Sequence, residues 1–145
     1  GDVVNESGKI EGNIGRSLKD RKVMDVFPDS QKGKHAVTNY KVIKRFGYVT
    51  LVECRLETGR THQIRVHLSD LGHSVIGDPL YGKPLPSKKL PSNISKDKFK
   101  LLKSFNRQAL HAKKLSFNHP ITRKFLEFDT SIPNDILNLI NILKS

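Results

Sequence analysis

Residues 55–82, which read RLETGRTHQIRVHLSDLGHSVIGDPLYG, constrain the fold of this chain more than any other segment. A run in which apolar and polar residues alternate ends just before Gly59, and Thr61, two residues further along, can cap a helix. Helical spacing continues to Leu71, and Gly72 can then end the helix in the left-handed conformation. The segment predicts a strand, a glycine turn and a helix, followed by a second glycine turn.

A β-hairpin is expected directly before this helix. Residues 37–44 and 49–57 are rich in β-branched and aromatic side chains, and a short glycine-containing link joins them. In the second run, Val52, Cys54 and Leu56 share one face, and charged side chains share the other. This is the pattern of a half-buried strand.

The remaining segments carry weaker patterns. The first 35 residues are polar and glycine-rich, which predicts turns at Ser7-Gly8 and Glu11-Gly12. The later elements expected are a short strand at 74–76, a loop at 83–96, a basic helix at 97–107, strands at 109–118 and 124–130, and a helix at 134–143. The side chains expected to face inward from the two helices are Phe99, Leu102, Phe105, Ile136, Leu139, Ile140 and Leu143. This order predicts an α+β fold, with a mostly antiparallel or mixed sheet and flanking helices, in one domain over residues 1–145.

The helix predicted from Thr61 has two distinct faces. An apolar stripe follows from a turn of about 100° per residue. Its members are Ile64, His67, Leu68 and Leu71. We interpret His67 as a packed core histidine, and we expect Gln63 and Asp70 to be exposed.

Arg60, His62 and Arg65 cluster at the start of the same helix. A helix N-terminus offers unpaired amide groups and a positive dipole end, so two guanidinium groups beside it can form an anion site. A partly buried Arg65 could equally form an internal ion pair with Glu57 or Asp78. The residues alone do not decide between these two interpretations.

The sequence offers no spacing that is typical of metal or cofactor sites. His62 and His67 are five residues apart and do not share a helical face, and there is no HExxH pattern. Cys54 is the single cysteine, so cysteine clusters are excluded. Glycine-rich nucleotide-binding motifs are also missing. We expect neither a metal nor a cofactor.

The positive charge is concentrated in one part of the chain. The net charge is +12, and residues 83–124 hold twelve of the 26 Lys and Arg residues but only one acid, Asp97. Such asymmetry favours a polyanionic partner, most simply a nucleic acid, although a solvated lysine-rich insertion would look similar. No apolar run is long enough for a membrane span, and a cytoplasmic location is the default expectation.

The strings GRTHQIRVHL and GHSVIGDPLYG closely resemble the third motif of the RluA-type pseudouridine synthases, which include the RluC and RluD branches. Further resemblance lies in GKHAVT at 33–38 with Tyr40, and in LHA at 110–112 with Phe117 and His119-Pro120. It covers the chain from about residue 9 to its end. The resemblance implies part of the catalytic fold of these enzymes.

The resemblance also implies a reaction and roles for individual residues. The enzymes isomerise uridine in RNA: the C1′–N1 bond breaks, the uracil turns and a C1′–C5 bond forms, without metal or cofactor. An Asp in an HRLD-x-x-T-S-G motif acts on the sugar, and by motif position Arg65 is the Arg that pairs with it. The candidate RNA contacts are Arg60, His62, Lys113, Lys114, Arg123 and Lys124. The residues expected to shape the motif are Gly59, Thr61, Gly72, Gly77, Asp78 and Tyr81.

The chain departs from the family pattern in one important respect. No HRLD-x-x-T-S-G motif occurs in its 145 residues, and neither the Tyr expected downstream of that motif nor an S4-like RNA-binding domain is present. Asp78 lies in a turn, where its side chain can bond local amides, and Asp70 lies on an exposed face, so neither replaces the missing Asp. We therefore expect the C-terminal portion of one catalytic domain, inactive alone because Arg65 has lost its carboxylate partner.

Other interpretations stay open at this point. A non-catalytic RNA-binding module could keep half of the synthase fold, and the coding sequence upstream of Gly1 would distinguish it from a fragment. A ribosomal or chromatin-like basic protein would explain the charge but not the GRTHQIRVHL string. Large-subunit ribosomal RNA is the expected substrate, with tRNA as the alternative. A truncated fold would also expose apolar surface and self-associate.

Overall fold

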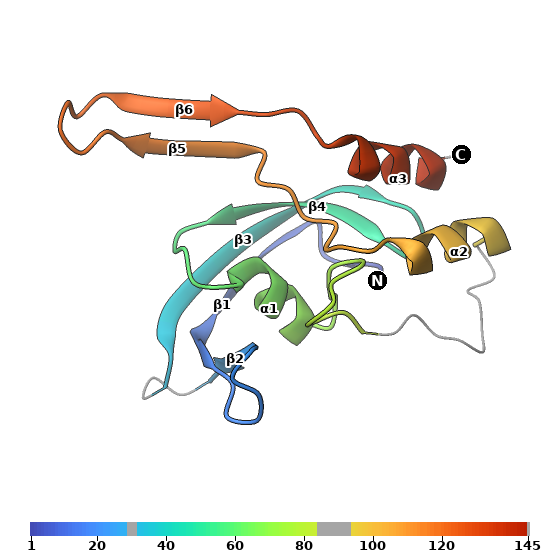
Figure 1. Ribbon diagram of the computed structural model, residues 1–145, viewed down its shortest axis with the longest axis horizontal. Helices are drawn as coiled ribbons and strands as arrows, with labels where there is room; N and C mark the ends of the chain where they lie inside the picture. The colour runs from blue at the N-terminus through green and yellow to red at the C-terminus, as the bar shows by residue number, and fades with distance from the viewer. Residues whose placement is uncertain (29–31, 84–93, 145) are drawn as a thin grey trace. The chain divides into compact units, whose positions relative to one another are not determined.

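The computed structural model describes residues 1–28, 32–83 and 94–144 (Figure 1). They fall into two compact units, Gly1–Gln108 and Ala109–Ser145, and each unit is described by itself. The loop expected at 83–96 lies mostly outside the described residues. Over the described ranges, no helix combines the length and apolarity that crossing a membrane requires.

Four antiparallel strands form the sheet of the first unit, in the order β2-β1-β3-β4 (Figure 1). The strands are β1 (Ser7–Arg16), β2 (Met24–Phe27), β3 (Lys34–Arg45) and β4 (Thr50–Leu56). Strands β3 and β4 form the predicted hairpin, with Tyr40 opposite Cys54. Glu53 and Arg55 are exposed and Val52 and Cys54 are partly buried, as the half-buried pattern predicts, but Leu56 at the end of β4 is exposed, so the prediction was wrong at that position.

Strand β1 runs through both positions where the sequence predicts a turn, Ser7-Gly8 and Glu11-Gly12, so both predictions were wrong. A Cβ on the first of these glycines would meet the ring of Tyr40 at 2.7 Å. A Cβ on the second would meet Cγ1 of Val26, also at 2.7 Å. These glycines therefore allow neighbouring side chains to lie against the strand instead of bending it.

Helix α1 (Gln63–Asp70) packs against β1, β2 and β3. The prediction that Thr61 caps it was wrong: the N-cap is His62, which has a φ of 57° and makes no side-chain capping bond. The C-terminal end agrees with the sequence. Gly72 has a φ of +90°, and the next amide donates to the carbonyl of Leu68, which is the Schellman arrangement.

The buried face of α1 differs from the predicted stripe. Its buried residues are Gln63, Arg65, Val66, His67 and Leu68. Leu71 is exposed, and Gln63, which was expected to be exposed, is buried. His67 is fully buried, and its Nδ1 lies 2.9 Å from Oγ1 of Thr38, so its interpretation as a core histidine is confirmed.

Two small apolar clusters of described residues stabilise the first unit. One consists of Ile14, Ala36 and Val66, with Met24, Val26 and Tyr81 packed against it. The other consists of Val3, Tyr40 and Val42, with Ile10, Val52 and Cys54 packed against it. The first cluster joins α1 to the sheet, and it fixes the helix that carries Arg65.

Outside these elements, the described residues of the first unit are mainly irregular, apart from one further helix. Residues 74–76 do not form the strand that the sequence predicts. Helix α2 (Lys96–Ser104) begins after Ser95, whose side chain accepts a hydrogen bond from the amide of Lys98. Phe99 and Leu102 are buried, as expected. Phe105 follows the helix, because α2 ends earlier than predicted.

The second unit is a hairpin followed by a helix. Strands β5 (Lys114–Asn118) and β6 (Phe125–Asp129) pair antiparallel, and α3 (Asn134–Lys144) follows them. The expected strand at 109–118 is shorter than predicted, because residues 109–113 are not in a strand. The expected inward side chains of α3 are buried: Ile136, Leu139, Ile140 and Leu143. The α+β class with antiparallel sheets is confirmed.

Candidate functional site

Arg65 and Asp78 form a buried ion pair. Arg65 donates through Nε to Oδ2 and through Nη2 to Oδ1 of Asp78, and both distances are 2.7 Å. The side chain of Arg65 is 10% exposed and that of Asp78 is 0% exposed. The sequence weighed this ion pair equally against an anion site, and the structure shows the pair. Arg65 thus has one carboxylate partner within the chain, and its expected pairing with the Asp of an HRLD motif stays a prediction.

Asp78 also organises the turn in which it lies. Its Oδ1 accepts hydrogen bonds from the amides of Leu80 and Tyr81, as expected for an Asp in a turn. Burial alone would raise the pKa of Asp78, but the bonds from Arg65 and from the two amides outweigh it. The pKa of Asp78 therefore lies below its ordinary value, and the carboxylate stays charged at neutral pH.

The environment of Asp78 argues against a role as the reacting carboxylate. Both of its oxygens already accept hydrogen bonds, and its side chain is not accessible to solvent. A nucleophile must be able to reach its substrate, and it loses reactivity when its lone pairs are all engaged. Asp78 is therefore suited to hold Arg65 in place.

Tyr81 connects this ion pair to the sheet. The guanidinium carbon of Arg65 lies 5.0 Å from the centroid of the Tyr81 ring, within the range of a cation–π contact. The Tyr81 hydroxyl accepts a hydrogen bond of 2.8 Å from the amide of Met24 in β2. The carbonyl of Tyr81 accepts a bond from Ser69 of α1. The second glycine turn is thus fastened to both the helix and the sheet.

His62 lies at the junction between the turn and α1, beside Tyr81. Its Nδ1 is 2.9 Å from the Tyr81 hydroxyl, and the two rings meet edge to face. Partial burial and the nearby charge of Arg65 lower the pKa of His62, although Asp78 opposes them. We therefore expect a neutral imidazole at neutral pH.

Gln63 is a residue of this junction that sequence reasoning missed. Its Oε1 accepts hydrogen bonds from the Thr58 hydroxyl and the Arg60 amide. Its Nε2 donates to the carbonyl of Val37 and the hydroxyl of Thr38. These four bonds explain how a polar side chain is buried here. Periodicity gave no signal for Gln63, because a polar residue with complete hydrogen bonding looks like a surface residue in a sequence.

The other expected residues of the helix start have different surroundings. Arg60 donates through Nε to the carbonyl of His35 at 3.0 Å, and its side chain is exposed. Glu57, the other candidate partner of Arg65, accepts a bond from Asn39 instead. Thr61 is exposed. The structure therefore brings four of the expected residues together. Arg65 and His62 both lie against the ring of Tyr81, and Asp78 is bonded to Arg65.

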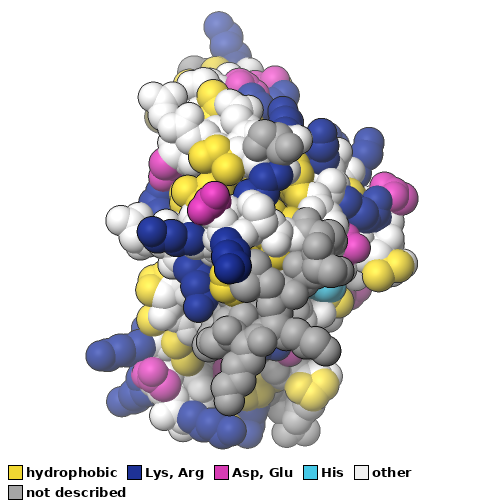
Figure 2. All heavy atoms as spheres, turned by 90° about the vertical axis from the view of Figure 1, so that its right-hand side faces the viewer, with side chains coloured by type: hydrophobic (Ala, Val, Ile, Leu, Met, Phe, Trp, Pro, Cys, Tyr) yellow, Lys and Arg dark blue, Asp and Glu magenta, His cyan; other side chains and the backbone are white. Residues whose placement is uncertain are grey.

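The basic residues proposed in the second unit lie on its hairpin or, in the case of Lys113, directly before it, and all of them are exposed. Lys113 pairs with Asp129 at 2.7 Å, and Lys114 pairs with Glu127 at 3.1 Å. Arg123 lies in the turn between the strands and has a φ of 59°. Among the described residues, no ion pair engages Arg123 or its neighbour Lys124. Figure 2 shows many Lys and Arg side chains on the visible face and fewer Asp or Glu side chains.

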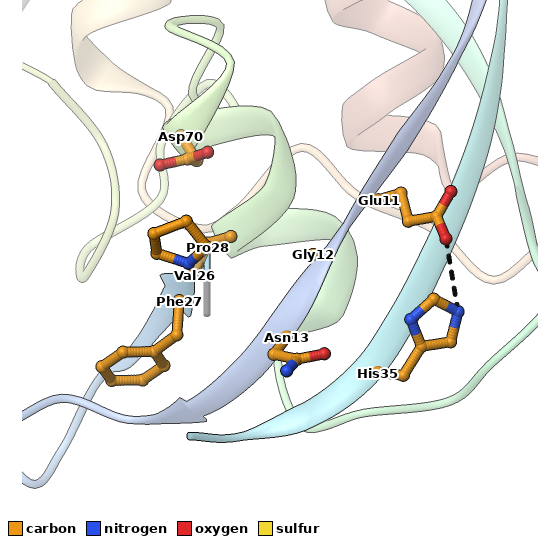
Figure 3. A pocket seen from close by; sticks show the side chains of 8 residues that line it. All are labelled: Glu11, Gly12, Asn13, Val26, Phe27, Pro28, His35 and Asp70. Carbon is orange, nitrogen blue, oxygen red and sulfur yellow. Dashed lines mark ion pairs between the residues drawn. The ribbon is translucent and has the colours of Figure 1, made fainter. Parts of the chain in front are cut away.

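A separate hollow of about 620 Å³ lies near β1 and β2 (Figure 3). Its lining residues are Glu11, Gly12, Asn13, Val26, Phe27, Pro28, His35 and Asp70. Glu11 and His35 approach each other there to 3.6 Å. The hollow shares no lining residue with the cluster around Tyr81. Over the described residues, no group of three or more His, Cys, Asp or Glu is arranged to hold a metal ion.

Comparison with known proteins finds matches in sequence and in structure. Residues 2–70 match a family described as RNA pseudouridylate synthase. The chain is 50% identical over 132 residues to an uncharacterized RNA pseudouridine synthase of Chlorobaculum parvum, which covers 90% of this chain and 40% of that protein. It is 45% identical over 138 residues to ribosomal large subunit pseudouridine synthase D of Zymomonas mobilis, covering 94% of this chain and 40% of that protein.

Solved structures agree with these matches at the level of the fold. Human RNA pseudouridylate synthase domain containing 1 superimposes with a TM-score of 0.67 and 24% identity, covering all of this chain and 62% of that one. Human RNA pseudouridylate synthase domain containing 4 superimposes with a TM-score of 0.63 and 23% identity, covering 96% of this chain and 57% of that one. The chain spans about two fifths of the length of the curated relatives described above.

Proposed function

Since the chain belongs to the RluA-type pseudouridine synthases, we propose that the protein of which it forms part converts uridine to pseudouridine in RNA. The substrate that we propose is large-subunit ribosomal RNA, because several relatives at 40–45% identity are named for it. We further propose that the chain is the C-terminal portion of one catalytic domain and acts in the cytoplasm.

The observation that carries this proposal is the fixed guanidinium of Arg65. A guanidinium has five N–H donors in a rigid fork. Asp78 takes the Nε and Nη2 edge, which leaves the N–H groups of Nη1 for a second carboxylate. In the reaction that the family performs, that carboxylate is the Asp of the HRLD motif. Arg65 would keep it ionised by charge proximity and would fix its direction toward the sugar.

Isomerisation requires that several steps occur at one position. The C1′–N1 bond breaks, the uracil turns, the C1′–C5 bond forms, C5 loses its proton, and N1 gains a proton. The target nucleotide must leave its stack before the site can reach it. Residues of this chain would hold the Asp and the nucleotide, whereas the Asp itself lies outside the 145 residues. We therefore propose that the chain alone is inactive.

Release of tritium from RNA that contains [5-³H]uridine tests both parts of this proposal. A longer protein that includes the HRLD motif should release tritium, and the 145-residue chain should not. In the longer protein, Arg65→Lys should lower kcat by about 10²-fold, because an ammonium cannot bond two carboxylates in fixed directions. Arg55→Lys is the matched control, since the Arg55 side chain is exposed and, among the described residues, pairs with Glu53 alone.

Two results would contradict the proposal. Robust tritium release by the chain alone would show that the HRLD Asp is not needed. Equal kcat values for Arg65→Lys and Arg55→Lys would show that Arg65 has no role in the reaction. Circular dichroism of each variant separates a loss of activity from a loss of fold.

A non-catalytic RNA-binding module is the second candidate, and the exposed Arg123 and Lys124 favour it. Under both candidates we propose RNA contacts by Arg60, His62, Lys113, Lys114, Arg123 and Lys124. The candidates differ in the longer protein: RNA binding without tritium release would favour the module. Self-association is a further proposal, since Leu115, Phe125 and Phe128 are exposed, and sedimentation as a monomer would contradict it.

A further inference from the structure

We propose that Tyr81 is a positioning residue that holds His62 with its proton on Nε2, so that His62 donates a hydrogen bond to the target nucleotide. This inference rests on the proposed function, because it needs an RNA nucleotide next to Arg65. It adds to that function a further contact of defined chemistry, an uncharged N–H donor that faces an oxygen acceptor.

The hydrogen bonds of the Tyr81 hydroxyl determine the direction of the proton. The Met24 amide, 2.8 Å away, can only donate, so the hydroxyl oxygen accepts this bond. The hydroxyl proton then needs an acceptor of its own. His62 Nδ1 lies 2.9 Å away, and no other acceptor for this proton is found in the part of the chain that the structure describes. Tyr81 therefore donates to Nδ1.

This direction fixes the tautomer of His62. A neutral imidazole carries one proton, and a nitrogen that accepts a hydrogen bond cannot carry it. With Nδ1 as the acceptor, the proton must reside on Nε2. The lowered pKa of His62 agrees with an uncharged ring at neutral pH. His62 thus offers one N–H donor at the far side of its ring from Tyr81.

The backbone of His62 supports a role beyond helix capping. His62 has a φ of 57°, a left-handed conformation that is unfavourable for a residue other than glycine. Its side chain nevertheless makes no capping hydrogen bond to α1. The strained backbone instead aims the imidazole at Tyr81. Strain of this kind persists where the surrounding structure holds it and often marks a functional position.

Tyr81 also brings His62 close to Arg65. The ring of Tyr81 lies 5.6 Å from the His62 ring, and its centroid lies 5.0 Å from the guanidinium carbon of Arg65. A nucleotide placed next to Arg65 is therefore also next to His62. The donor at Nε2 suits either a uracil carbonyl or a ribose or phosphate oxygen, since these share the chemistry of an acceptor oxygen.

Nitrogen-15 NMR of the imidazole groups tests the tautomer in the 145-residue chain without RNA. In the wild type, Nε2 of His62 should carry the proton and Nδ1 should give the signal of an unprotonated nitrogen. Tyr81→Phe keeps the ring over Arg65 but removes the hydroxyl, so the two tautomers should become mixed. Tyr48→Phe is the matched control, because the buried Tyr48 hydroxyl has no hydrogen-bond partner within the described residues, and it should leave the His62 signals unchanged.

The contact itself is tested by adding a short adenosine RNA that holds one uridine, and the same RNA with an abasic residue there. The Nε2–H signal of His62 should shift with the uridine RNA. A shift that disappears with the abasic RNA assigns the acceptor to the uracil, and a shift that persists assigns it to the sugar or phosphate. Both results support the contact.

Other outcomes would overturn the inference. A proton on Nδ1 in the wild type, or no change in Tyr81→Phe, would refute the role of Tyr81. Shifts at other residues without a shift at His62 would refute the contact while the proposed function stands. Failure of the proposed function is read separately, as an absence of tritium release by the longer protein, and it does not alter the tautomer of the free chain.

Discussion

The guanidinium of Arg65 and the carboxylate of Asp78 are joined by two hydrogen bonds of 2.7 Å across 13 residues of sequence. The pair links the helix of the GRTHQIR motif to the turn of the GDPLYG motif. Because both side chains are buried, neither can turn to water if its partner is lost. The stability of the first unit should therefore depend on keeping both.

Asp78→Asn should lower the free energy of unfolding by about 3 kcal/mol or more. The substitution keeps the size of the side chain but leaves the positive charge of Arg65 buried without compensation. Urea denaturation of the variant and the wild type measures the difference. Glu53→Gln is the control, since Glu53 also bonds an Arg at 2.7 Å but does so at the surface, and we expect little change there.

The double variant Arg65→Met with Asp78→Asn sharpens this prediction. It should be more stable than Asp78→Asn alone, because it removes the uncompensated charge. The prediction is wrong if Asp78→Asn loses no more stability than Glu53→Gln.

Alanine substitutions at three glycines should form a graded series. Gly59→Ala should be neutral or slightly stabilising, because its Cβ would meet nothing within 4 Å. Gly72→Ala should cost about 1–2 kcal/mol, because its φ of +90° is unfavourable for alanine even in open space. Gly77→Ala should cost most, since its φ is +69° and its Cβ would lie 2.2 Å from the carbonyl oxygen of Arg107. Thermal unfolding of the three variants gives the order, and any other order would contradict it.

The stability of the chain should fall as the pH drops below about 6.5. Burial lowers the pKa of His67, so the unfolded chain takes up a proton in this range before the folded chain does. A depressed histidine pKa gives stability that is present above the unfolded value and is lost as the pH falls toward the folded value. Each such histidine contributes at most about 1.4 kcal/mol per pH unit. His62 and His73 share the direction of this shift.

Urea denaturation between pH 7.5 and about 5 measures this slope, well above the range in which Asp78 takes up a proton. His67→Gln should be less stable at neutral pH, because it loses the fitted contact with Thr38. Its stability should nevertheless depend less steeply on pH. An unchanged slope in this variant would show that His67 does not bind the extra proton.

The salt dependence of RNA binding should distinguish the basic residues of the hairpin. If Arg123 contacts a phosphate, Arg123→Gln should reduce the slope of log K against log salt by about 0.7 on single-stranded RNA. Lys114→Gln should reduce it less, because Glu127 already neutralises part of that charge. Fluorescence anisotropy at several salt concentrations measures the slopes. Lys9→Gln, at an exposed pair with Glu11, is the control, and equal effects in all three variants would contradict the assignment.

Local sequence patterns correctly predicted those elements whose stabilising contacts lie within the same stretch of sequence. The β3–β4 hairpin follows from alternation, the end of α1 from Gly72, and the buried face of α3 from helical spacing. In each case the residues that specify the element also form its contacts. The family resemblance likewise depends on contiguous strings, and the comparisons confirm it.

Patterns failed where distant contacts override them. The sequence predicted turns at Gly8 and Gly12. Both lie in strand β1 instead, where the side chains of Tyr40 and Val26 occupy the space that a Cβ would need. Gln63 was predicted to be exposed, but it is buried with four hydrogen bonds, two of which it donates to Val37 and Thr38 of the distant strand β3. The partner of Arg65 was one of two named candidates, and only the fold decides between them.

The Arg65–Asp78 pair also limits how this protein can be altered. A segment that contains Arg65 cannot be exchanged for one with a neutral residue unless the turn at Asp78 is exchanged with it. The two motifs therefore behave as one transplantable module, with its charge balance inside it. Engineering by recombination should place crossover points outside residues 59–82, because a crossover within them can inherit a cation from one parent without the anion from the other.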